Sequence, residues 1–437
     1  MEDQERENNN NNHLLSSKTT QKYILHYEDS ELKNLRVFLT WACVDQSNPW
    51  KTSLSWSVFF LFCIGVPVVA HFVLFCSSCE DEDHLQPFDS IVELSLSAIS
   101  ILSFLSLTKF AKKYGLKRFL FLDKLCEESE RVRQGYTIQL QRSIKILCMF
   151  VLPCFVADTA YKIWWYVTGG PKIPHFGNLV VSHTVACFLE QCSWLYRTSI
   201  FFLACVLYRV SCYLQILRLE DFAQVFQLET DVALVLLEHL RVRRTLRIIS
   251  HRFRTFLLFT LLLVTASQFA SLLVTTKSDS SIDIYTAGEL ALCSLTLVTG
   301  VCICLRSAAK ITHKAQAITS LAAKWHVCAT IDSFDVVEGE TQITSSTSPL
   351  AFPYSAHSES DDEEGDGDDY LDNTKMIPVF ANTISYQKRQ ALVTYLENNR
   401  AGITVYGFML DRSYLHTIFG VELSLVLWLL SKTVGIS

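Results

Sequence analysis

Six ionisable side chains lie within long apolar stretches of this chain, and their types and positions make them the best candidates for chemistry. They are Glu93, Asp158, Lys162, Glu190, Arg197 and Glu289. An ionised side chain at the centre of a membrane-spanning helix costs about 2.5–3.5 kcal/mol on insertion scales, so such residues usually face a partner, a cavity or water. The pattern predicts either a polar ligand site or a set of ion pairs between helices.

Seven apolar stretches must hold these side chains in place. They cover residues 54–76, 88–108, 144–167, 183–210, 253–275, 284–305 and 415–433. A helix needs about 20 apolar residues to cross the hydrocarbon core of a bilayer, where every backbone polar group must be paired within the protein. Each stretch is long enough, so the sequence predicts an all-α, seven-transmembrane helical membrane protein in contact with the lipid bilayer.

The loops between these stretches alternate in charge. The loops after the first, third and fifth stretches hold at most one Lys or Arg each, whereas those after the second, fourth and sixth are rich in Lys and Arg. Because basic residues near helix ends remain in the cytoplasm, the N-terminus is predicted to be cytoplasmic and the C-terminus outside. This topology is the reverse of a G-protein-coupled receptor, so the helix count does not indicate that class.

The composition fits a membrane protein and offers no catalytic motif. The chain is 50% hydrophobic and 19% charged, which is too apolar for a soluble protein of 437 residues. It has no His-Glu-x-x-His zinc motif, no Gly-x-Ser-x-Gly turn and no phosphate-binding loop. We therefore expect an integral, multi-pass protein of the plasma membrane or an endomembrane. We expect no enzyme, no catalytic residues, no metal site, no cofactor and no nucleic-acid partner.

Composition also divides the chain into four segments. Residues 1–28 predict a disordered N-terminal tail, and residues 29–328 predict an amphipathic N-terminal helix followed by spans 1–6 with cytoplasmic helices between them. Residues 329–380 predict an acidic, disordered cytoplasmic insert. Residues 381–437 predict the cytoplasmic approach to span 7 and the span itself.

The acidic insert contains two candidate phosphorylation sites. Ser358 and Ser360 precede acidic residues, a context that acid-directed kinases prefer. The spacing of the acids also imitates a calcium-binding loop, but Asn373 stands where such a loop needs a bidentate Glu. We therefore favour phosphorylation over calcium binding for this segment.

The predicted topology places all the ionisable residues of the spans except Arg197 in the outer half of the membrane, together with several aromatic side chains. One hypothesis is a cavity open to the outside that binds a small ligand, with cations favoured by the carboxylates and aromatic faces. The candidate ligand-binding residues are Glu93, Asp158, Tyr161, Trp165, Glu190, Trp194, Gln268 and Glu289. The alternative is a set of interhelical salt bridges with an interfacial aromatic belt, in which Asp158 and Lys162 pair within one helix.

The seventh stretch carries a narrow stripe of small and hydroxyl-bearing residues. At 100° per residue, five positions fall within about 80° of one another. They are Thr417, Gly420, Ser424, Trp428 and Ser431. Such a stripe is either a close helix-packing face or the lining of a water-filled pore formed when copies assemble around an axis. Glu422 points to the opposite side, towards the rest of the bundle.

Segments near both ends of the chain resemble a known family. Residues 44–50 (Val-Asp-Gln-Ser-Asn-Pro-Trp), followed by Leu-Ser-Trp-Ser-Val-Phe-Phe and then Gly-Val-Pro at 65–67, resemble the opening of the plant gustatory receptor-like proteins. These are relatives of the insect gustatory and odorant receptors. Residues 403–420, from Ile-Thr-Val-Tyr-Gly-Phe to His-Thr-Ile-Phe-Gly, resemble the approach to the last span of the insect receptors.

The resemblance implies a subunit of a homotetrameric, ligand-gated cation channel with an outer ligand pocket. In that arrangement the cytoplasmic helices and residues 383–399 form a central anchor, and span 7 lines the pore. The resemblance maps the stripe onto the pore and suggests Leu427 or Trp428 as a hydrophobic constriction. Where the insect signature has Thr-Tyr in mid-helix, this chain has Ser424 followed by Leu425.

We therefore expect a chemoreceptor-like cation channel that responds to an unknown small molecule. The candidate pore-lining residues are Thr417, Gly420, Ser424, Leu427, Trp428 and Ser431. The alternative is a non-conducting multi-pass scaffold or signalling protein that recruits partners through its acidic insert and basic helices. A transporter is less favoured, because no pair of discontinuous helices and no internal repeat is evident.

Overall fold

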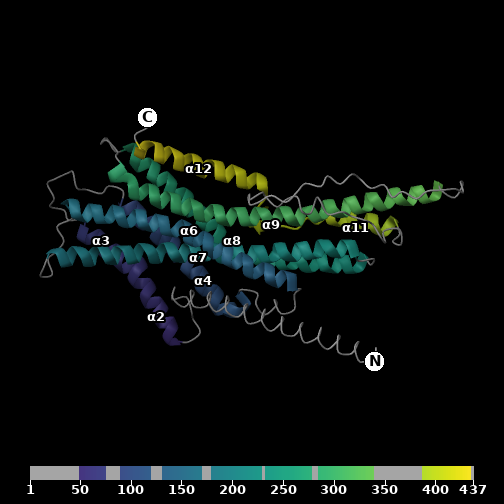
Figure 1. Ribbon diagram of the computed structural model, residues 1–437, viewed down its shortest axis with the longest axis horizontal. Helices are drawn as coiled ribbons and strands as arrows, with labels where there is room; N and C mark the ends of the chain where they lie inside the picture. The colour runs from purple at the N-terminus through teal and green to yellow at the C-terminus, as the bar shows by residue number, and fades with distance from the viewer. Residues whose placement is uncertain are drawn as a thin grey trace, which may run out of the picture. The chain divides into compact units, whose positions relative to one another are not determined.

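The protein is built almost entirely of long α-helices, as a computed structural model shows (Figure 1). The structure describes residues 49–74, 89–119, 130–169, 179–228, 232–277, 284–338 and 386–434. Within them, seven helical segments are long and apolar enough to cross a membrane, which confirms the predicted number of apolar helices. The chain is an integral, multi-pass membrane protein. Residues 1–28, the amphipathic segment after them, and Ser358 and Ser360 lie outside the described residues.

The first span is not a regular helix along its whole length. It begins as α2 (Pro49–Phe60), continues as one π-helical turn (Leu61–Gly65) and ends as α3 (Val66–Leu74). The π turn closes with the N–H of Val66 donating to the carbonyl of Leu61, one residue further back than in an α-helix. Pro67 follows at once, and a proline offers no N–H to the preceding turn. The irregular turn therefore coincides with the position where regular helical bonding must stop.

Five further helices are longer than a membrane span requires, and the last helix is about as long as one span. The five are α4 (Asp89–Phe119), α6 (Glu130–Gly169), α7 (Leu179–Leu228), α8 (Val232–Lys277) and α9 (Ile284–Glu338), and the last is α12 (Arg412–Val434). The fourth and fifth spans continue as long helices, α7 and α8, as their apolar periodicity predicts, and α9 does the same. Pro153 lies inside α6 without ending it. α9 continues to Glu338 and so enters the segment 329–380, for which disorder was predicted.

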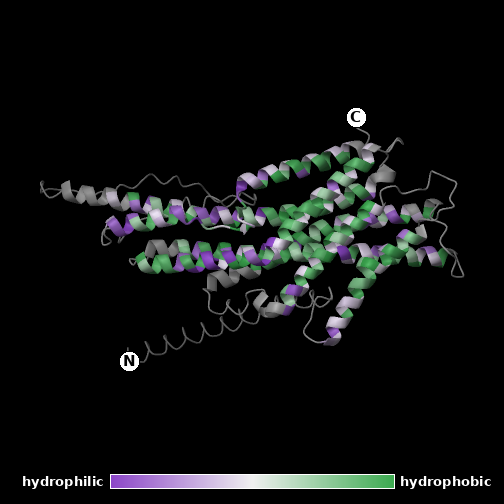
Figure 2. Ribbon diagram, turned by 180° about the vertical axis from the view of Figure 1, so that it is seen from behind, coloured by the Kyte–Doolittle hydropathy of each residue, from purple (hydrophilic) through white to green (hydrophobic). Residues whose placement is uncertain are grey.

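The helices belong to two compact units, and α7, α8 and α9 contribute residues to both. The first unit comprises residues up to 211, residues 253–307 and residues from 415 onwards. Hydrophobic residues dominate it in Figure 2. Its core is aromatic and tightly packed: the rings of Phe59 and Phe104 stack with centroids 4.1 Å apart. Gly300 on α9 faces the ring of Phe201 on α7 so closely that a Cβ there would lie 2.3 Å from the ring. The missing side chain lets these two helices pack in close contact.

The second unit comprises residues 212–252 and 308–414, and its described residues include parts of α7, α8 and α9, a short helix and a hairpin. α11 (Tyr386–Asn398) buries Arg389, Leu392, Val393 and Leu396, which share one helical face. Asn399 just after it accepts a hydrogen bond from Arg243 at 2.7 Å. The antiparallel strands β1 (Thr404–Val405) and β2 (Phe408–Met409) follow.

The turn between β1 and β2 has two residues with positive φ, Tyr406 at 49° and Gly407 at 94°, as tight hairpins require. Two side-chain hydroxyls hold the first strand in the second unit. The Ser250 hydroxyl accepts from the N–H of Thr404, and the Thr312 hydroxyl accepts from the N–H of Ile403, both at 3.1 Å. The sequence had not predicted this hairpin.

Candidate functional site

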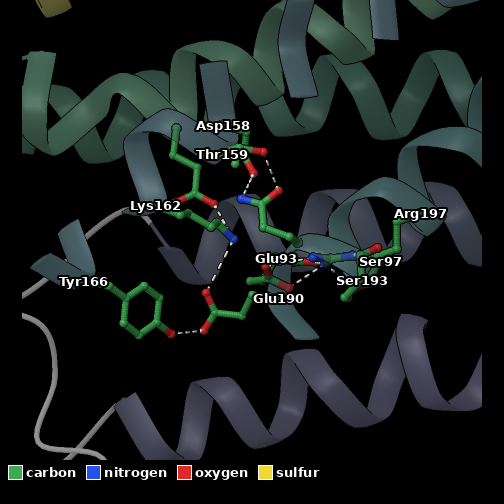
Figure 3. A network of polar contacts seen from close by, with 11 residues as sticks. Glu93, Ser97, Asp158, Thr159, Lys162, Tyr166, Glu190, Ser193 and Arg197 are labelled. Atoms are coloured by element: carbon green, nitrogen blue, oxygen red, sulfur yellow. Dashed lines mark hydrogen bonds and ion pairs between the residues drawn. The ribbon is translucent and has the colours of Figure 1, made fainter. Parts of the chain in front are cut away.

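Arg197 and Glu93 form the best-defined ion pair of the first unit (Figure 3). Arg197 lies near the middle of α7 and is almost fully buried. Its Nη2 donates to Glu93 Oε1 at 2.9 Å, and its Nη1 donates to Oε2 and, at 3.2 Å, to the hydroxyl of Ser97 on α4. This bidentate arrangement satisfies both charges and cross-links α7 to α4.

Lys162 on α6 lies between two carboxylates from other helices. Its ammonium nitrogen is 3.6 Å from Glu190 Oε2 on α7 and 3.5 Å from Glu289 Oε1 on α9. These distances allow electrostatic attraction but exceed those of a direct N–H···O hydrogen bond. Glu190 also accepts a hydrogen bond from the Tyr166 hydroxyl at 3.0 Å through its other oxygen. Three helices therefore converge on one buried ammonium group.

Asp158, one helical turn before Lys162, has a different partner. The amide of Gln191 on α7 donates to Asp158 Oδ2 at 2.9 Å, and the Thr159 hydroxyl donates to the Gln191 oxygen at 3.1 Å. Asp158 is fully buried, and its Oδ1 has no hydrogen-bond partner among the described residues. The hypothesis that Asp158 and Lys162 pair within α6 is not what the structure shows, because Lys162 instead pairs with carboxylates of α7 and α9.

The structure thus brings four of the eight predicted ligand-site residues into one network: Glu93, Asp158, Glu190 and Glu289. The other four are placed separately. Trp194 is buried against Phe155, and the ring of Tyr161 lies beside Gly288. Gln268 is buried on α8, and the side chain of Trp165 lies outside the described residues. The interhelical ion pairs of the second interpretation are present.

Several members of the network were not among the predicted site residues. Gln191, Thr159, Ser193 and Ser97 supply hydrogen bonds that orient the charged groups. Ser193 also donates to the carbonyl of Phe62 in the first span at 2.6 Å. These residues could have been recognised from the sequence, because each is a polar residue within an apolar stretch and lies one to four positions from an ionisable residue.

The last helix, α12, shows two opposite faces. Glu422 is 2% exposed and accepts a hydrogen bond from the hydroxyl of Thr265 on α8, which confirms the prediction that it points into the bundle. The stripe lies on the other side: Thr417, Gly420, Ser424 and Leu427 are exposed, and Trp428 and Ser431 are partly exposed. A Cβ added at Gly420 would meet no atom within 4 Å.

The described residues offer no alternative chemistry of the usual kinds. No group of three or more His, Cys, Asp or Glu among them is placed to hold a metal ion. The ten cysteines whose side chains the structure describes are free thiols, half of them buried. The polar groups of the spans are therefore suited to electrostatic binding and to helix positioning.

Fold and site together define a multi-pass helical membrane protein with a buried network of charges. The chain belongs to the family described as protein of unknown function (DUF3537), whose model matches residues 30–421. A search of curated proteins finds no match. The match covers all the helices from α2 to α11, the hairpin and the first part of α12, so the charge network and the hairpin both lie within the family's shared region.

Proposed function

We propose that the chain is a subunit of a ligand-gated cation channel, with α12 as the pore-lining helix. This proposal rests on one observation, the difference between the two opposite faces of α12. The Glu422 face is tied to α8 through Thr265, whereas Gly420 and Ser424 are exposed on the other side of the helix, with open space around Gly420. An exposed stripe of this kind is in contact either with a second copy of the chain or with water.

The arrangement suits a pore better than a lipid-facing surface. Lipid offers no advantage to a row of hydroxyl and glycine positions, whereas pore water hydrates them when copies surround a common axis. Leu427, which is 56% exposed, lies at one edge of the stripe and can narrow such a pore by excluding water. The resemblance near the C-terminus supports a homotetramer, with α11 and the hairpin in the anchor.

In this proposal, a small ligand acts through the helices that carry the charge network. α4, α6, α7 and α9 are held together by buried ion pairs, and α12 is tied to α8 by Glu422. A ligand that binds among the outer ends of these helices has to prefer one arrangement of the bundle in order to shift the pore. The candidate ligand-site residues remain those of the network together with Tyr161, Trp165, Trp194 and Gln268.

Reconstitution in planar bilayers tests the proposal. Purified oligomer should pass cation current on addition of an activating ligand, and Ser424→Trp should block it by filling the pore. Leu423→Trp is the matched control, because Leu423 is also exposed on α12 but points about 100° away from Ser424 on the helical wheel. Current that is equally insensitive to both substitutions contradicts the assignment of the pore face. An intact oligomer that never conducts favours the non-conducting scaffold.

A further inference from the structure

Three carboxyl groups share one ammonium group in the interior of the first unit. Glu190 and Glu289 lie 3.6 and 3.5 Å from Lys162, and Asp158 is close enough to interact electrostatically with Lys162 and Glu289. Arg197 cannot compensate the excess, because both of its terminal nitrogens are engaged by Glu93. With all three carboxyl groups ionised, one ammonium group would leave two negative charges uncompensated.

The hydrogen bonds distinguish the three carboxyl groups from one another. Glu190 uses both oxygens, one with the Tyr166 hydroxyl and one with Lys162. Asp158 uses only Oδ2, and its buried Oδ1 has no partner. Glu289 Oε1 lies 3.5 Å from Lys162, about as close as Glu190, and accepts no hydrogen bond. Asp158 is therefore the one carboxyl group of the three that has neither Lys162 within ion-pair distance nor a second hydrogen bond, and it is the least suited to being ionised.

Burial makes the excess negative charge of the three carboxyl groups energetically unfavourable. An ionised group without hydrogen bonds in an apolar interior is strongly disfavoured, and like-charged carboxylates that share one site do not all ionise. A bound metal ion is the other way to neutralise them, but no metal-binding group is found among the described residues. A proton bound to a carboxyl oxygen removes the negative charge and needs no set of coordinating ligands.

We propose that the Lys162 site is a proton-binding site, in which Asp158 is a neutral carboxylic acid at neutral pH while Glu190 and Glu289 share the ammonium group of Lys162. The groups that face the site are the Glu93–Arg197 pair from α4 and α7, the Tyr166 hydroxyl from α6, and the thiols of Cys187 and Cys293 from α7 and α9. None of them adds a positive charge beyond Arg197, which Glu93 already balances.

The proposal makes the charge balance around Lys162 dependent on proton occupancy. With Asp158 neutral, Lys162 is shared by Glu190 on α7 and Glu289 on α9. Loss of the Asp158 proton adds a third carboxylate, on α6, and repulsion between it and the two glutamates. Conditions that remove the proton therefore weaken the packing of α6 against α7 and α9.

Infrared spectroscopy of the purified full chain detects the protons directly. A neutral carboxylic acid has a carbonyl stretch well separated from that of a carboxylate, and exchange into D₂O shifts it. At neutral pH the wild type should show this band, and Asp158→Asn should remove the part of it that belongs to the Lys162 site. Glu422→Gln identifies any contribution from the buried carboxyl group of α12, which also has an unpartnered oxygen.

Asp158→Glu keeps the acid and should move the band without removing it, which covers the case in which Asp158→Asn fails to fold. Absence of the band from the wild type at neutral pH overturns the proposal, as does a band that a folded Asp158→Asn variant leaves unchanged. A band that sodium or potassium chloride abolishes at constant pH also overturns it, because a metal cation would then occupy the site. The proposal predicts a band that persists in both salts.

Discussion

Both terminal nitrogens of Arg197 on α7 donate hydrogen bonds to the carboxylate of Glu93 on α4, so a bidentate guanidinium–carboxylate pair lies inside the apolar bundle. The backbone carbonyl of Arg197 is also engaged, because it accepts a hydrogen bond from the Ser100 hydroxyl of α4 at 3.1 Å. The two helices are therefore joined by polar contacts of both the side chain and the main chain at the same level.

Glu93→Gln should strongly destabilise the protein, because it leaves the buried guanidinium of Arg197 without its countercharge. Removal of one partner of a buried ion pair typically costs about 3–5 kcal/mol. The free energy of unfolding in detergent micelles measures this effect. The double variant Glu93→Gln with Arg197→Met should recover much of the loss, since it removes the orphaned charge as well. Equal stability of the single variant and the wild type would show that water reaches the pair.

Gly300→Ala should destabilise the contact between α7 and α9. The new Cβ would lie 2.3 Å from Cε1 of Phe201, so the buried ring or the helices must shift, and overpacking of this kind costs about 1–3 kcal/mol. Gly420→Ala is the matched control, because its Cβ would meet nothing within 4 Å. That substitution should be neutral, or stabilising by up to about 1 kcal/mol through helix propensity. Adding Phe201→Leu to Gly300→Ala should restore part of the loss.

Thr265→Val should loosen α12 from α8. The hydroxyl of Thr265 is the donor to Glu422, and its removal leaves a buried carboxyl oxygen without a partner at a cost of about 1–3 kcal/mol. Thr276→Val, at the exposed end of the same helix, removes a hydroxyl that bonds only to its own helix and should change stability by less than about 0.5 kcal/mol. Equal melting temperatures for the two variants would argue against the contact between α8 and α12.

Gly407→Ala should weaken the hairpin without any steric clash. Its φ of 94° lies in the region that side chains avoid, while its Cβ would meet no neighbour. The expected cost is about 1–2 kcal/mol from backbone conformation alone. Gly402→Ala offers a contrast at normal φ, because its Cβ would lie 2.9 Å from Thr312 Cγ2 on α9. Hydrogen exchange at the N–H of Leu410, which bonds to the Ile403 carbonyl, reports on both. Unchanged protection in Gly407→Ala would contradict the turn geometry.

Much of the fold could be predicted from hydropathy, because the length of an apolar stretch directly sets a membrane span. The direction of Glu422 could also be predicted, since it depends only on the 100° rotation per residue within one helix. The partners of Lys162 could not. Asp158 is its neighbour at i–4, but Glu190 and Glu289 reach it only because α6, α7 and α9 converge, and their rotation about their own axes is not encoded in local spacing. The hairpin at Tyr406 could not be predicted, because its strands have only two residues each.

The central claim is that the stripe on α12 faces water in the assembled protein. Labelling of Ser424→Cys with a membrane-impermeant thiol reagent, read out by mass spectrometry of reconstituted oligomers, tests it most directly and does not depend on an activating ligand. Leu423→Cys is the control, because Leu423 is also exposed but points about 100° away from Ser424, and the wild type accounts for the native thiols, among them the exposed Cys148. The account predicts labelling at position 424 and not at position 423. Protection of position 424, or equal labelling of both, contradicts it.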